Sequence, residues 1–141
     1  MKPAKFAILP IVLAMLAACE SEAEKQADAT EDRIERRAEQ SASAAGDTVA
    51  ALGLTERQLL DADLVAEDGT ELGDVEQVRR DTAGTVTGFL VEIEDSNPDR
   101  FVVVPLDGLA VRKGALNDAD LQTSMTAQDL AGMPDAVLDA R

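Results

Sequence analysis

Hydrophobic and polar residues follow three successive patterns along this chain. Residues 6 to 18 form an apolar run interrupted by Pro10, and residues 20 to 53 are mainly Ala and charged or polar residues. From about residue 61 onward, short apolar segments alternate with Gly, Asp, Asn and Pro. This succession predicts an apolar N-terminal segment, a polar connector and one small folded domain.

The folded domain is predicted from short strand-like segments spaced about ten residues apart. Residues 85 to 94 alternate between apolar and polar side chains, and residues 101 to 104 form a Phe and Val run that favours a buried strand. A β-bulge is expected near Gly73. No helical pattern separates the strands, so we expect an all-β fold, a small antiparallel barrel or sandwich. The expected strands are 64–66, 72–80, 85–94, 100–106, 109–112 and 121–125.

Two short helical turns are predicted at the borders of the domain. Thr55 with Gln58 has the spacing of a capping box and introduces one turn before the first strand. Thr126 is expected to cap a closing helical turn before Pro134. Residues 135 to 141 follow Pro134, and we expect them to fray.

The N-terminal segment has the properties of a secretory signal. Lys2 and Lys5 precede the apolar run, which at 13 residues falls short of the roughly 20 that a membrane-spanning helix needs. The junction Leu16-Ala17-Ala18-Cys19 resembles the lipobox of bacterial lipoproteins. The resemblance implies that the signal peptide (1–18) is removed and that Cys19 carries a thioether-linked diacylglycerol and an acylated amino group.

A single cysteine in an exported chain has no internal disulfide partner, which agrees with lipidation. Two alternatives are an uncleaved anchor and an ordinary signal peptide. Cleavage after Ala18 by the general signal peptidase would put Leu16 where a small residue is required. Glu20 stands where Asp retains Gram-negative lipoproteins at the inner membrane, so the resemblance favours the periplasmic face of the outer membrane.

Residues 19–54 are expected to be a polar tether. Ile34 is its only large apolar residue before Val49, so we expect a partly helical segment that is solvated on all sides. Its reach would be about 50 Å as a helix or roughly 30 to 35 Å as a coil. The alternative of a coiled coil lacks an apolar heptad.

Charge and residue inventory exclude several classes of function. The chain has 13 Lys plus Arg against 28 Asp plus Glu, a formal charge of −15, which argues against nucleic-acid binding. With no His and one Cys, the chain alone cannot form a Cys/His zinc site, a Ser-His-Asp triad or a Cys-His pair.

Two segments of the folded domain resemble the PRC-barrel family. Residues 64–78 combine a first strand, an Asp-Gly turn and a hydrophobic-Gly-x-Val second strand, and residues 100–106 match a later strand that ends in Pro-Leu. The resemblance implies a small PRC-barrel-like domain at 55–131, with a C-terminal tail at 132–141. Members of this family occur in ribosome maturation factors and in the reaction-centre H subunit, so it also implies protein contact and assembly.

Candidate chemistry is confined to acidic side chains. Carboxylates at turns can bind Ca²⁺, but the spacing lacks the twelve-residue loop pattern, so solvated charges are the favoured interpretation. Glu92 and Glu94 lack the Trp or Tyr platform that sugar chemistry uses. No catalytic, cofactor-binding or metal site is therefore predicted. The densest acidic cluster is Asp61, Asp63, Glu67, Asp68, Glu71, Asp74 and Glu76.

The sequence thus predicts a lipid-anchored protein of the cell envelope with a non-catalytic PRC-barrel module for binding or assembly. It would meet the membrane through its acyl chains and a protein partner through complementary charge, a basic surface being favoured. The alternative is a small-ligand carrier or an unrecognised periplasmic hydrolase, which would need a large pocket lined by convergent polar groups.

Overall fold

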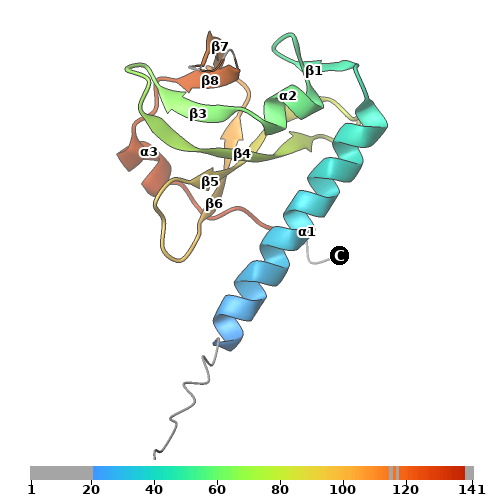
Figure 1. Ribbon diagram of the computed structural model, residues 1–141. Helices are drawn as coiled ribbons and strands as arrows, with labels where there is room; N and C mark the ends of the chain where they lie inside the picture. The colour runs from blue at the N-terminus through green and yellow to red at the C-terminus, as the bar shows by residue number, and fades with distance from the viewer. Residues whose placement is uncertain (1–20, 115, 117, 139–141) are drawn as a thin grey trace, which may run out of the picture.

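The computed structural model describes residues 21–114, 116 and 118–138. The predicted signal peptide and the lipobox with Cys19 lie outside these residues. The described part of the chain starts with a long helix, α1 (Glu22–Ala45), followed by the hairpin of β1 (Val49–Ala51) and β2 (Leu54–Thr55). Helix α2 (Glu56–Leu60) leads into a six-stranded sheet, and α3 (Ala127–Ala131) follows it (Figure 1).

All six strands expected from the pattern are present in the sheet, shifted by at most a few residues. The strands are β3 (Asp63–Ala66), β4 (Glu71–Arg80), β5 (Val86–Ile93), β6 (Phe101–Pro105), β7 (Ala110–Lys113) and β8 (Ala119–Thr123). Their spatial order is β6-β5-β4-β3-β8-β7. Strands β3 and β8 are parallel, and the other neighbouring pairs are antiparallel.

The prediction of an all-β antiparallel barrel is wrong. The fold is mixed α/β, with a 24-residue helix and a mixed six-stranded sheet that stays open. Closure would require β6 and β7, which lie at opposite ends of the sheet, to pair with each other. β7 has only four residues, all exposed, and offers little surface for such pairing.

The expectation of a fully solvated tether is also wrong. Ile34, Ala38 and Ala42, spaced four residues apart, form one stripe on α1 and are buried, and α1 packs against β4. Two of these residues are alanines, so the stripe adds little hydrophobicity and is easily taken for part of a polar helix. Among the described residues, no helix has the length and apolar character needed to cross a bilayer.

The main core lies between the sheet and the short helices α2 and α3. Phe89 and Val91 of β5 are fully buried in it, together with Leu59 of α2 and Leu130 of α3. Leu90 is also fully buried but outside this cluster, because alternate residues of a strand point to opposite faces. Both short helices are capped where the sequence predicts, α2 by the expected capping box at Thr55 and α3 by Thr126, which also forms a capping box, with Asp129.

The predicted β-bulge lies next to Gly73. Leu64 of β3 is paired with Gly73 and Val65 with Glu71, so Leu72 is the extra residue on β4. A Cβ at position 73 would collide with the carbonyl oxygen of Glu92 and lie 2.8 Å from Cγ1 of Val91. The close approach of β4 and β5 therefore requires glycine here.

The C-terminal segment is hydrogen-bonded to β6 and to Arg100 just before it at residues 131 to 136, so the start of the tail that was expected to fray contacts the sheet. The Arg100 guanidinium donates hydrogen bonds to the carbonyl oxygens of Ala131 (2.9 Å) and Met133 (3.0 Å) and to Asp135 Oδ1 (2.8 Å). The N–H of Ala136 donates to the carbonyl of Phe101 at 2.7 Å.

Candidate functional site: a row of carboxylates on the sheet

Three carboxylates lie side by side across the middle of the sheet. Asp74 of β4 is paired with Asp63 on β3 on one side and with Glu92 on β5 on the other. Like charges placed directly opposite each other destabilise an antiparallel pair. This arrangement, which we call the carboxylate row, is therefore a feature that strand pairing alone does not favour.

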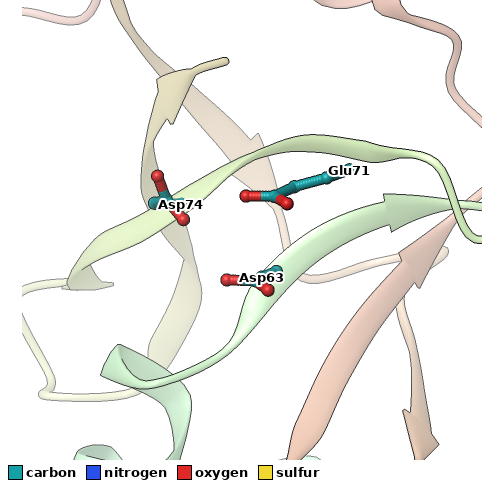
Figure 2. A group of neighbouring side chains, drawn as sticks. All are labelled: Asp63, Glu71 and Asp74. Carbon is teal, nitrogen blue, oxygen red and sulfur yellow. The ribbon is translucent and has the colours of Figure 1, made fainter. Parts of the chain in front are cut away.

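Glu71 joins the row from the bulged end of β4. One carboxylate oxygen from each of Asp63, Glu71 and Asp74 lies within 4.8 Å of the others, and the three side chains come from two adjacent strands (Figure 2). Asp63 and Asp74 are half-buried, whereas Glu71 is exposed. The cluster is thus open to solvent on one side.

Burial and the shared negative charge both raise the pKa values of Asp63 and Glu71. Burial raises the pKa of Asp63, and the neighbouring Asp74 raises it further by its charge and a hydrogen bond. Burial also raises the pKa of Glu71, with added repulsion from Asp63 and Glu94. In both cases desolvation and like charge act in the same direction, against the ionised form.

Glu76 is the most strongly affected carboxyl near the row. It is the extra residue of a second irregularity in β4, because Val75 is paired with Val91 and Gln77 with Leu90. Its half-buried position raises its pKa to about 7, first through desolvation and then through the charges of Glu92 and Asp74, with Glu35 and Glu31 of α1 adding to them.

An open groove of about 480 Å³ runs between α1, α2 and β4 beside these residues. Leu60, Ala62, Val75 and Ala38 supply its apolar part. All of its charged lining residues are acidic: Glu35, Glu39, Asp61, Asp63, Asp74 and Glu76.

Several arginines are placed away from the groove. Arg33, Arg37 and Arg79 line a separate small depression beside Ile34 and Leu138. Arg80 is paired with Glu56 at 2.8 Å, and Arg100 with Asp135 at 2.7 Å. Opposite charges are therefore separated around α1: the acidic groove lies along one flank of the helix and the basic depression along the other.

The carboxylate row can bind positive charge. Ca²⁺ takes six to eight oxygen ligands, and three carboxylates of the described part of the chain converge here, which is less than a full ligand set for that ion. The chain alone cannot form a Cys-His or Ser-His pair, because it has no His and its one Cys is Cys19. The site therefore supports electrostatic recognition.

The sequence anticipated part of this site. The predicted acidic cluster includes Asp63, Glu71, Asp74 and Glu76, which the structure brings together. Asp68 lies instead in the β3–β4 turn, where hydrogen bonds from Thr70 lower its pKa.

Glu92 was considered together with Glu94, but its place next to Asp74 was missed. Strand register decides that contact, and a single sequence does not display register. Phe101, expected in the core, is only half-buried and lines a groove beside α1.

No model of a known protein family matches this chain, and no curated protein has a matching sequence. The resemblances to lipoproteins and to PRC-barrel domains thus remain predictions from the residues quoted above, except that the closed barrel implied by the second is contradicted by the open sheet.

Proposed function

We propose that this protein is a lipid-anchored component of the bacterial cell envelope and acts by binding a protein partner. The observation that carries the proposal is the junction Leu16-Ala17-Ala18-Cys19, which follows a short apolar run and contains the only cysteine of the chain. A thioether at Cys19 accounts for that lone thiol in an exported protein.

Acylation makes the attachment durable. Each buried CH₂ contributes about 0.8 kcal/mol, so a single chain is held only marginally, whereas two or three chains remain in the bilayer. Because Glu20 follows Cys19 in place of Asp, we assign the protein to the periplasmic face of the outer membrane.

The carboxylate row supports the binding role. It places Asp63, Asp74 and Glu92 side by side at a cost in stability, within a chain whose net charge is −15. A partner with a basic surface would neutralise this charge, and long-range attraction would speed its approach. We therefore propose a binding or assembly function for the carboxylate row.

The lipid anchor is tested by replacing Cys19 with Ser and labelling cells with a fatty-acid probe. We expect the variant to remain an unprocessed precursor without label. The Glu20→Asp variant is the matched control, because it should be labelled normally and move toward the inner membrane. A labelled Cys19→Ser protein would refute the proposal.

Binding of a partner by the carboxylate row is tested by crosslinking in intact envelopes. The double variant Asp74→Asn/Glu92→Gln should lose a crosslinked product that the wild-type protein forms. The control Glu67→Gln/Asp107→Asn makes the same change in net charge at exposed turn positions and should retain that product. Equal loss in both double variants, or binding that strengthens with ionic strength, would contradict recognition by the row.

A further inference from the structure

We propose that α1 is a short rigid spacer that holds the sheet beside the bilayer, with the β5–β6 loop as the end of the body nearest the lipid. A partner that binds the carboxylate row must then lie at the same membrane surface. This inference rests on the proposed lipidation of Cys19 and adds the position and orientation of the folded body.

Helix α1 begins at a well-defined residue close to Cys19 in the sequence. Ser21 closes a capping box: its Oγ accepts a hydrogen bond from the N–H of Glu24 (3.2 Å), and its own N–H donates to Glu24 Oε2 (2.7 Å). Ser21 follows Cys19 by two residues, so covalent geometry limits the distance between their Cα atoms to about 7 Å. The helix therefore begins next to the residue that would carry the lipid.

Helix α1 is long and is packed against the sheet. Its 24 residues extend for about 36 Å at 1.5 Å per residue. Ile34, Ala38 and Ala42 bury one face of the helix, and α1 contacts both β4 and α2. Because the helix is continuous and docked, it fixes the direction in which the body extends from the anchor.

The β5–β6 loop is the part of the folded domain that lies beside the first turns of α1. Pro98 and Asp99 of the β5–β6 loop line a groove of about 250 Å³ together with Gln26 and Ala27 of α1. These helical residues lie about one turn from the start of α1, or about 6 to 8 Å along its axis. The β1–β2 hairpin follows the opposite end of the helix (Figure 1).

The body consequently lies alongside the helix and not beyond its far end. A free, flexible 34-residue tether would let the domain move about at a typical distance of roughly 30 to 35 Å from the lipid, in any direction. The docked α1 removes that freedom and leaves one residue, Glu20, between Cys19 and the helix cap. Acidic residues Glu22 and Glu24 in the first turn disfavour a helix lying flat on anionic lipid.

The orientation is tested by energy transfer in vesicles. The lipidated full chain is reconstituted in phosphatidylcholine vesicles that contain a headgroup-labelled acceptor lipid. A lipidated Cys19 has no free thiol, so a fluorescent donor attaches only to an introduced cysteine. Asp99→Cys and Asp47→Cys form a matched pair, because both replace an exposed aspartate, one in the β5–β6 loop and one just past α1.

We expect higher transfer efficiency from position 99 than from position 47. Equal transfer, or higher transfer from position 47, would overturn the inference. A flexible Gly-Ser insertion of about 20 residues between Glu20 and Ser21 should abolish the difference, and a difference that persists would also overturn it.

Failure of the underlying lipidation is recognised separately. Mass spectrometry and vesicle flotation of each labelled variant are measured first, and thermal melting confirms that it is folded. A folded chain that carries no lipid and does not float would refute the proposed function. A lipidated, floating chain with equal transfer from the two positions would refute only the spacer.

Discussion

Replacing Glu76 with Gln isolates the electrostatic strain of the acidic groove. Gln has nearly the same shape as Glu but carries no charge, so it resembles the protonated carboxyl at every pH. The structure raises the pKa of Glu76 from 4.5 to about 7, chiefly through desolvation and then through the charge of Glu92. The variant should therefore differ from the wild-type protein in the pH range where Glu76 is ionised.

The sign follows from proton binding. Between pH 4.5 and about 7 the folded state holds the Glu76 proton and the unfolded state releases it. The contribution of this group to stability is therefore full below pH 4.5 and is lost as the pH rises through about 7. At pH 8 the wild-type protein bears the whole cost of the charged side chain, and the Gln variant avoids it.

The magnitude is set by the pKa and by exposure. A pKa raised from 4.5 to about 7 corresponds to about 3 kcal/mol before screening, since each unit is about 1.4 kcal/mol. Glu76 is only half-buried, so solvent screening reduces the figure to about 1–2 kcal/mol. In a domain of this size that corresponds to a rise in Tm of about 4–8 °C.

The assay is urea or thermal unfolding at pH 4.5 and pH 8. Glu76→Gln should be more stable than the wild-type protein at pH 8 and nearly equal to it at pH 4.5. Glu67→Gln, at an exposed turn, is the control and should change stability by less than about 0.5 kcal/mol at either pH. An equal effect at both pH values, or destabilisation at pH 8, would refute the reasoning.

Three further substitutions probe the packing. Ile34→Ala should cost about 2–3 kcal/mol in urea unfolding, because Ile34 is the largest side chain that α1 buries, and an unchanged midpoint would mean that α1 is not docked. Gly73→Ala should cost about 2–3 kcal/mol in the same assay, since its Cβ would meet the backbone of Glu92, and wild-type stability would contradict that contact. Arg100→Ala should cost about 2 kcal/mol and speed amide hydrogen exchange in residues 131–138, and exchange as slow as in the wild-type protein would show that Arg100 does not hold them.

The local elements of the fold were accessible from sequence, but their assembly was not. The caps at Thr55 and Thr126 and the bulge beside Gly73 depend on residues within a few positions of each other, and the structure confirms them. Whether β6 and β7 pair depends on the curvature of the whole sheet. The parallel pairing of β8 with β3 joins segments more than 50 residues apart and leaves no local signal.

The candidate site shows the same division. The density of acidic residues between 61 and 76 was visible in the sequence, yet the contact of Asp74 with Glu92 follows from the register of β4 against β5. The docking of α1 was missed for a different reason. Ala38 and Ala42 bury little area each, so hydrophobicity alone does not distinguish their stripe from a solvated helix.

The segment after α3 also shields one margin of the sheet from other molecules. β6 is an edge strand of the sheet, and the N–H of Ala136 donates a hydrogen bond to the carbonyl of Phe101 at its start. Terminal strands with free backbone groups recruit further strands and promote aggregation. Trimming the chain before residue 133, or fusing a tag that pulls this segment away, would therefore free the carbonyl of Phe101 and lengthen the unpaired part of β6 that another strand could join.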